Sequence, residues 1–193
     1  MSPWTTTMPT AWRGMKYRVP RLAGLRLIAA AIVIGLFAVG CGSTVEGVPE
    51  RASGQEGLFN PCTDIPDSVI EEVGLDPSTE LIDIDGVEQP GWKMCMWKST
   101  WYFFTIMSTK YTLDDVRSNS DYTKFDESII ADRVGLWFQR ESDETIDGCY
   151  LAFAASQGSV WLNIEADAGT PHQGSTCGLV ESFALQLVSS LPR

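Results

Sequence analysis

The chain has 193 residues, a formal net charge of −11, and a composition that is 44% hydrophobic and 20% charged. This length and composition fit one globular domain with tails and exclude a collagen-like or a disordered chain. The strong acidity argues against nucleic-acid binding, which requires a basic surface against phosphate. Because the chain has a single histidine, we expect no histidine-based metal site and no other cofactor.

The first forty residues differ in charge from the rest of the chain. They contain five basic residues and no acidic residue, whereas the remaining residues carry 9 basic and 25 acidic side chains, a net charge of −16. An apolar run, 27–40, follows Arg26 and is shorter than the roughly 20 residues of a membrane span. We therefore predict that residues 1–40 are an export signal, with an uncleaved membrane anchor as the alternative. Residues 1–14 precede a good signal start at Met15, which indicates an over-extended start site.

The apolar run ends in Ala38-Val39-Gly40-Cys41, which resembles the lipobox of bacterial lipoproteins. In that pattern a cysteine after a small residue becomes lipidated, and the usual leucine three positions earlier is Ala38 here. The resemblance implies a diacylglyceryl thioether on Cys41 and two or three acyl chains, of which two suffice for stable anchoring. An ordinary cysteine behind a plain secretory signal is the alternative. Residues 41–57 are then the lipidated cysteine and a flexible tether to a globular domain, residues 58–193.

The first half of the predicted domain contains a short helix and a hairpin. The helix begins after Asp64, where apolar residues share one face, and ends at Gly74. Residues 81–84 form a candidate edge strand. The segments 92–98 and 101–108 predict a hairpin, and the second segment is apolar on both faces, as expected of a central strand covered on both sides.

The second half contains two further helices and three strands. Residues 112–115 resemble a capping box at the start of a second helix, and residues 121–131 have no clear pattern. Ser175 or Thr176 caps a final helix that ends at Pro192. We therefore predict an α+β fold: a twisted, mostly antiparallel sheet with the N- and C-terminal helices packed on it. The predicted strands of this half are residues 133–140, 148–155 and 159–166.

Four cysteines remain in the predicted domain: Cys62, Cys95, Cys149 and Cys177. An even number in an exported chain indicates two disulfides, and four cysteines allow three connectivities. The spacing allows an arrangement in which Cys62–Cys95 and Cys149–Cys177 each tie a terminal helix to a strand. A four-thiolate metal site is one alternative, but no Cys-x-x-Cys pair is present. A catalytic Cys177 assisted by His172 is another.

Several of these segments together resemble LprB-type lipoproteins of mycobacteria and related actinobacteria, over about residues 58–191. The resemblance implies the disulfides Cys62–Cys95 and Cys149–Cys177 and a location on the outer face of the plasma membrane. These lipoproteins carry a small exported domain of unknown function without established catalytic residues, so none is carried over. The matching residues are Phe59-Asn60-Pro61-Cys62, Cys95-Met96-Trp97, Gly148-Cys149-Tyr150-Leu151 and Cys177 at the start of a helix.

The chain contains none of the common catalytic motifs, such as a nucleophile elbow, a phosphate loop or His-Glu-x-x-His. We therefore predict a non-catalytic envelope protein that binds a small lipid, a glycan or an envelope protein, while acyl chains on Cys41 contact the membrane. Trp92, beside a Pro-Gly turn, and Trp161, which alternates with polar residues, are the candidate binding aromatics, and we expect both to face outward.

Two other functions stay open at this point. An accessory subunit of a membrane complex would use the acidic surface against a basic partner. A cell-wall hydrolase would use His172 and paired carboxylates facing one cleft. The carboxylate clusters are 71–72, 114–115 and 143–147.

Overall fold

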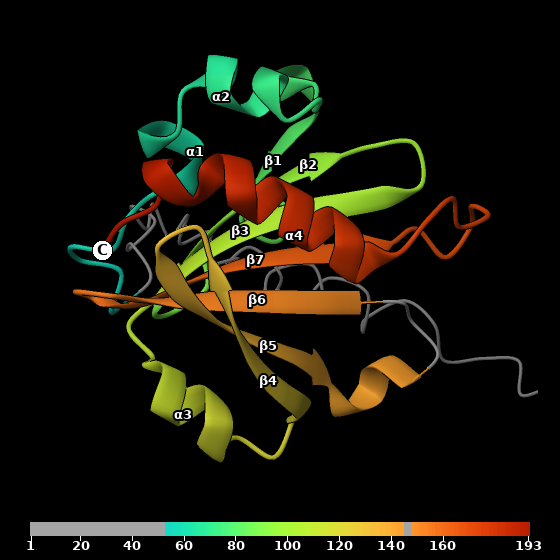
Figure 1. Cartoon of the computed structure of the whole chain (residues 1–193). Helices are drawn as coiled ribbons and strands as arrows, with labels where there is room; N and C mark the ends of the chain where they lie inside the picture. The colour runs from blue at the N-terminus through green and yellow to red at the C-terminus, as the bar shows by residue number, and fades with distance from the viewer. Residues whose placement is uncertain (1–52, 145–147) are drawn as a thin grey trace, which may run out of the picture. The chain divides into compact units, whose positions relative to one another are not determined.

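The computed structural model describes residues 53–144 and 148–193, which form a seven-stranded sheet with helices on both faces (Figure 1). The strand order is β1-β2-β3-β7-β6-β5-β4, and all neighbouring strands are antiparallel. The strands are β1 (Glu80–Ile82), β2 (Trp92–Lys98), β3 (Tyr102–Thr109), β4 (Tyr122–Ile130), β5 (Arg133–Arg140), β6 (Gly148–Ala155) and β7 (Gly158–Ala166).

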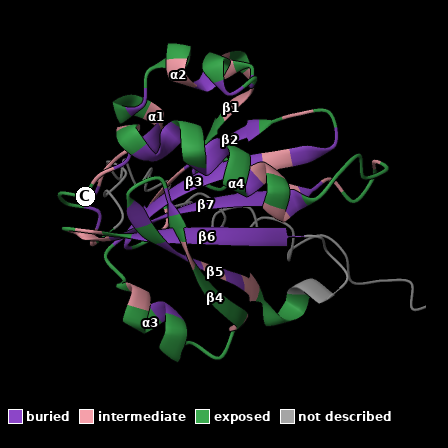
Figure 2. Cartoon of the chain, viewed as in Figure 1, coloured by how far each residue is buried: buried purple, intermediate pink, exposed green. Residues whose placement is uncertain are grey.

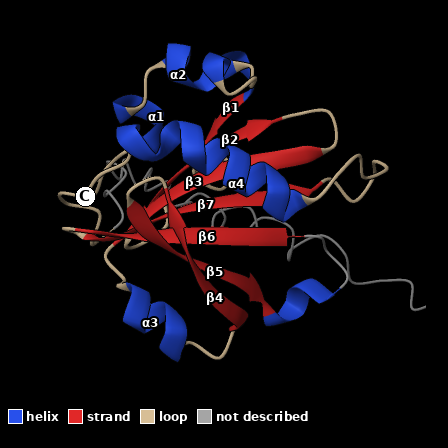
Figure 3. Ribbon diagram, in the orientation of Figure 1, coloured by secondary structure: helices blue, strands red, loops and turns tan. Residues whose placement is uncertain are grey.

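Short helices connect and cover these strands (Figure 3). Several begin at a capping side chain: Ser175 accepts a hydrogen bond from the Gly178 amide at the start of α4, and Thr112 and Asp115 form the predicted capping box of α3. The helices are α1 (Pro61–Asp64), α2 (Asp67–Glu72), α3 (Leu113–Ser118) and α4 (Thr176–Leu187), and the 3₁₀ helices are η1 (Pro77–Thr79), η2 (Glu141–Glu144) and η3 (Val188–Ser190).

The main core lies between α4 and the middle of the sheet. α4 packs across β6 and β7, and its buried side chains include Val180, Phe183 and Leu187. The Phe183 ring meets the Phe104 ring of β3 edge to face, with centroids 4.9 Å apart. Figure 2 shows that burial concentrates in the middle strands β3, β7 and β6, so the apolar face of α4 accounts for one of the two faces they bury.

Alternate residues of the same strands build a second cluster on the opposite face. Met107 of β3 and Trp161 of β7 belong to it, whereas their neighbours Ile106 and Leu162 belong to the main core. α3 contributes the buried Val116 to this second cluster. Because successive side chains of a strand point to opposite faces, the middle strands are apolar on both sides, as predicted for the β3 segment.

Both predicted disulfides are present. Cys62 of α1 is bonded to Cys95 of β2, and Cys149 of β6 is bonded to Cys177 of α4. Each bridge ties a helix near one end of the domain to a strand. The predicted α+β fold with terminal helices on an antiparallel sheet is therefore confirmed, and so is the disulfide pairing.

Two predicted segments change in detail. The segment without a clear pattern, 121–131, is the edge strand β4, and the predicted edge strand 81–84 is shortened to β1. Beyond Ile82 the chain leaves the sheet, because Asp83 and Asp85 adopt left-handed backbone conformations with φ of 55° and 53°. A β-bulge in β4, described below, breaks the alternation that identifies a strand in a sequence.

Removing both cysteines of either bridge should lower the free energy of unfolding by about 3 kcal/mol, because each disulfide restricts the unfolded chain. The variants are Cys62→Ala/Cys95→Ala and Cys149→Ala/Cys177→Ala, which open loops with sequence separations of 33 and 28. Urea unfolding of the full chain measures the change. Cys41→Ser is the control, since it leaves both bridges intact. Losses below about 1 kcal/mol would contradict a stabilising role for the bridges.

Candidate functional site

A groove of about 570 Å³ lies between the β4–β5 hairpin and the first turns of α4, beside the Cys149–Cys177 disulfide. This volume lies within the roughly 300–1,000 Å³ that small-molecule sites occupy. β4 and β5 supply one side of the groove and α4 the other, with Cys149 of β6 between them. The lining residues are Lys124, Asp126, Ser128, Trp137, Phe138, Gln139, Cys149, Cys177, Gly178 and Glu181.

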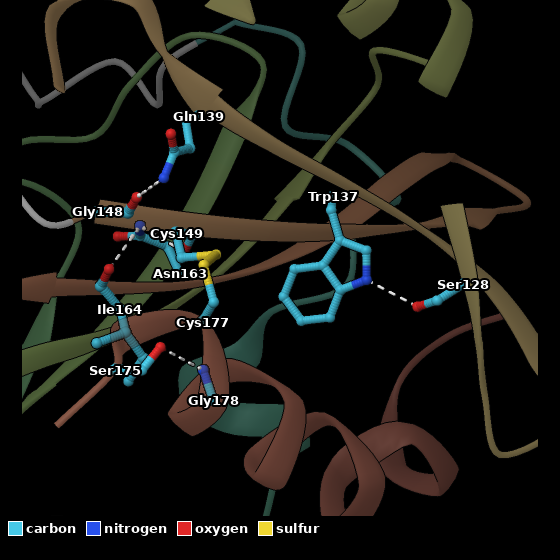
Figure 4. The surroundings of a disulfide bond; sticks show 10 residues. All are labelled: Ser128, Trp137, Gln139, Gly148, Cys149, Asn163, Ile164, Ser175, Cys177 and Gly178. Carbon is cyan, nitrogen blue, oxygen red and sulfur yellow. Dashed lines mark hydrogen bonds between the residues drawn. A yellow bond between two sulfur atoms is a disulfide. The ribbon is translucent and has the colours of Figure 1, made fainter. Parts of the chain in front are cut away.

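Trp137 is the one tryptophan that lines this groove. Its side chain is half-buried, and its indole N–H donates a 2.7 Å hydrogen bond to the Ser128 hydroxyl on the neighbouring strand. Figure 4 shows the indole lying between β4 and α4, next to the disulfide. Because the hydrogen bond satisfies the polar atom of the ring, Trp137 is held in one orientation and offers the groove an apolar surface.

Side-chain amides that donate to backbone carbonyls fix the disulfide side of the groove. Cys149 is 2% exposed, whereas Cys177 is half-buried. The Asn163 amide donates to the Cys149 carbonyl at 3.2 Å, and the Gln139 amide donates to the Gly148 carbonyl at 3.3 Å (Figure 4). These bonds hold β6 against β7 and β5, so the bridge presents a rigid sulfur surface to the groove.

A β-bulge directs a lysine into the groove. Thr123 pairs with Gln139 and Asp126 pairs with Trp137, so two residues of β4 oppose a single residue of β5. The first of these two, Lys124, has a left-handed backbone with φ of 56°. The extra residue changes the direction of the side chains at the bulge. Lys124 lines the groove together with Asp126.

The same bulge keeps two aromatic side chains on the opposite face. The rings of Tyr122 and Phe125 lie 5.0 Å and 6.2 Å from the Phe138 ring of β5. In a regular strand, residues three apart would point to opposite faces. The bulge thus allows β4 to place Lys124 and Asp126 on the face toward α4, and the rings of Tyr122 and Phe125 on the face of the second cluster.

Charged groups of both signs surround the apolar surface that the Trp137 indole offers. Lys124 and Asp126 of β4 are exposed, as is Glu181, one turn into α4 from Cys177. The half-buried Gln139 adds an amide. The groove therefore combines a fixed aromatic surface with hydrogen-bond donors and acceptors, which suits a ligand with both apolar faces and hydroxyl or amide groups.

The two tryptophans predicted to bind a ligand lie elsewhere, in contact with each other. The rings of Trp92 and Trp161 meet edge to face at 4.8 Å, within the second cluster. The expectation that both face outward is wrong for Trp161, which is 3% exposed, while Trp92 is half-buried. Alternation with Asn163 misled the prediction, because Asn163 is itself buried and hydrogen-bonded to the Cys149 carbonyl.

The residues that the sequence suggested for a hydrolase do not line the groove. His172 is exposed, with its ring 5.9 Å from the Trp101 ring. Asp114 pairs with Arg117, and Asp115 caps α3. The other carboxylate clusters are on α2, at residues 71–72, and at residues 143–147, whose side chains lie outside the described part of the chain.

The groove carboxylates, Asp126 and Glu181, were missed by the sequence analysis. Asp126 is followed by Glu127, Glu181 has no acidic neighbour, and 55 positions separate Asp126 from Glu181 in the chain. Only the contact between β4 and α4 brings their elements together. The adjacent acids Asp126 and Glu127 were a local signal for one side of the groove, but no local pattern links them to Glu181.

One group of three potential metal ligands occurs among the described residues: Cys62, Glu80 and Cys95, whose ligand atoms lie within 4.8 Å of one another. The two sulfur atoms are joined in a disulfide and are not thiolates, so they do not bind a metal in this state. Burial, followed by the charge of Asp67, raises the pKa of the Glu80 carboxyl.

Comparison with known proteins places the chain in a family. A family model described as a protein of unknown function, DUF3558, matches residues 36–190. The chain belongs to the DUF3558 family. No curated protein and no solved structure matches it significantly.

The described part of this DUF3558 protein also bears on where it works. Its two disulfides indicate an exported protein, since such bridges persist in oxidising compartments. In the described residues, none of the helices combines the length and the apolar character that a membrane crossing needs. Cys41 and the rest of residues 1–52 lie outside the described part, so the export signal, lipidation and tether stay predictions.

The bulge at Lys124 should reverse the usual preference of a strand for valine over glycine. Lys124→Val should lower the free energy of unfolding by about 1–2 kcal/mol relative to Lys124→Gly, because only glycine adopts φ near 56° without strain. At Ile129, an exposed and regular position of β4, valine should be better than glycine by up to about 1 kcal/mol. Urea unfolding of the four variants measures both differences. The same order at both positions would contradict the bulge.

Proposed function

We propose that this DUF3558 protein is a lipid-anchored, extracytoplasmic binding protein that holds a glycan ligand in the groove between the β4–β5 hairpin and α4. The observation that carries the proposal is the indole of Trp137, fixed by Ser128 on the floor of a groove with polar sides. No catalytic step is part of this proposal.

The lipid anchor is supported by the sequence around Cys41. The apolar run and Ala38-Val39-Gly40-Cys41 resemble a signal with a lipobox, and the DUF3558 match begins at residue 36, so it includes this cysteine. The disulfides support an oxidising compartment beyond the membrane. The resemblance to LprB-type lipoproteins supports the outer face of the plasma membrane as the location.

A glycan fits the chemistry of the groove. A sugar ring presents an apolar face of C–H groups, which can stack on an indole, and a rim of hydroxyl groups that donate and accept hydrogen bonds. Asp126 and Glu181 supply acceptors, Lys124 supplies donors, and Gln139 supplies both. Neither a purely apolar lipid tail nor a highly charged phosphate would use this mixture fully.

Two carboxylates on one groove also favour a second candidate function. Glycoside hydrolysis uses a pair of carboxyl groups on either side of the bond that breaks. Asp126 lies on β4 and Glu181 on α4, on opposite sides of the groove. The binding experiment below distinguishes the two functions, because a hydrolase would shorten the sugar chain.

Cys41→Ser should release the protein from the membrane fraction, because the acyl chains are the proposed anchor and the net charge of −16 beyond residue 40 disfavours anionic lipid surfaces. Fractionation of cells that express the full chain, followed by immunoblotting, measures the change. Cys177→Ser, which removes a cysteine of the groove disulfide, is the control and should leave the protein membrane-bound. An unchanged membrane fraction for Cys41→Ser would refute lipid anchoring.

Trp137→Ala should weaken glycan binding by about five- to twelvefold, since it removes the stacking surface, worth roughly 1–1.5 kcal/mol. The probe is a panel of soluble oligosaccharides that includes β-1,4-linked N-acetylglucosamine trimers, titrated by calorimetry into the purified Cys41→Ser full chain. Trp137→Phe keeps an aromatic ring but loses the hydrogen bond to Ser128, so its affinity should lie between those of the parent protein and Trp137→Ala.

The control for this experiment is Tyr111→Ala, which truncates a 43% exposed aromatic side chain that does not line the groove. Its affinity should equal that of the parent protein. If no member of the panel binds, or if Trp137→Ala binds as well as the parent, the glycan proposal fails. Shortened oligosaccharides in the mixture, detected by mass spectrometry, would favour the hydrolase instead.

A further inference from the structure

We propose that the turn between β1 and β2 contacts the lipid bilayer directly, through an aliphatic patch formed by Ile82, Ile84 and Val87. This contact is additional to the acyl chains on Cys41, and it rests on the proposed lipid anchor. The patch lies on β1 and the turn that follows it, whereas the glycan groove is formed by other strands and by α4.

The patch is exposed to an extent that is unusual for aliphatic side chains. Ile82, Ile84 and Val87 are 55%, 54% and 61% exposed and lie within six residues of the chain. Single exposed apolar residues are common on proteins, but a cluster of them marks a contact with a partner or a membrane. We therefore expect this cluster to be covered by a partner or a membrane.

The backbone of the turn holds these side chains outward. The Val87 amide donates to the Ile84 carbonyl at 2.9 Å, and the Gly86 amide donates to the Ile82 carbonyl at 3.0 Å. Asp83 fixes the turn to β2, because its amide donates to the Met94 carbonyl and its carboxylate accepts from the Met94 amide. The patch is thus part of an ordered turn and does not fold back onto the core.

The chain enters the described domain beside this turn. The Gly91 amide donates to the Ser53 carbonyl at 2.9 Å. The amide of Gln55, which is 4% exposed, donates to the carbonyls of Gln89 and Trp92 at 3.1 Å and 2.7 Å. The segment that leads from Cys41 therefore joins the domain at the β1–β2 connection.

The length of that segment limits the distance from the acyl chains. Twelve positions separate Cys41 from Ser53, which span about 40 Å when fully extended and about 20 Å on average as a flexible coil. A protein anchored through Cys41 therefore keeps the β1–β2 turn close to the lipid surface. This attachment is the reason for proposing lipid, and not a protein partner, as the occupant of the patch.

Nearby charges set the strength and the salt dependence of the contact. Asp85 and Glu88 flank the aliphatic side chains, with Lys93 on the neighbouring strand. The two carboxylates are repelled by anionic lipids, and this repulsion weakens as salt screens it. A contact made by aliphatic side chains should therefore strengthen with salt, opposite to one made by basic residues.

Site-specific photo-crosslinking in intact envelopes tests the contact. The full chain carries benzoylphenylalanine in place of Ile84 or Val87, and in place of Ile129 as the control. Ile129 is 74% exposed and lies on β4, the strand at the opposite edge of the sheet from β1. After irradiation, adducts with alkyne-labelled phospholipid are measured on the purified protein, and non-reducing gels verify both disulfides.

We expect lipid adducts at positions 84 and 87 to exceed those at position 129 at least fivefold, and to increase between about 50 and 500 mM salt. Equal yields at the three positions, a yield that falls with salt, or protein adducts in place of lipid at 84 and 87 would overturn the proposal. The Cys41→Ser fractionation is read separately. If that variant stays membrane-bound, lipid anchoring fails, whereas the position dependence of the adducts still decides whether the turn contacts lipid.

Discussion

The packing of α4 across the middle of the sheet is the interaction on which the rest of the structure depends. Val180, Phe183 and Leu187 cover β6 and β7, and the Cys149–Cys177 bridge fixes the first turn of the helix to β6. The helix covers these strands but leaves the β4–β5 hairpin beyond its flank. The groove exists because the helix is narrower than the sheet it covers, and the bridge forms part of its lining.

The bulge in the β4–β5 hairpin positions charged and aromatic side chains on opposite faces of β4. It directs Lys124 and Asp126 toward α4, while Tyr122 and Phe125 stay in contact with Phe138 on the other face. A strained lysine backbone is thus compensated by aromatic packing on one side of the strand. Strain of this kind persists only where the surroundings hold it in place, and it is frequent at binding sites.

The sequence was sufficient for the elements with strong local signals. The hairpins, the capped final helix and the fold class follow from alternation, capping residues and the cysteine count, and the pairing follows from the resemblance to LprB-type lipoproteins. β4 was not recognised because its bulge interrupts the alternation, and Trp161 was misplaced because a buried, hydrogen-bonded Asn163 looks like a surface residue in a sequence. The groove depends on the contact between β4 and α4, which local patterns do not report.

The two sheet edges have a consequence for the proposed lipid-anchored state, in which many copies would share one membrane plane. Confinement to a surface raises the rate at which exposed strands meet, and long flat edges would then pair and aggregate. Here one edge strand, β1, has only three residues, and the other, β4, is interrupted by its bulge and carries Lys124, Asp126 and Glu127. Neither edge of the described sheet therefore offers a long, flat template to which a second copy could add a strand.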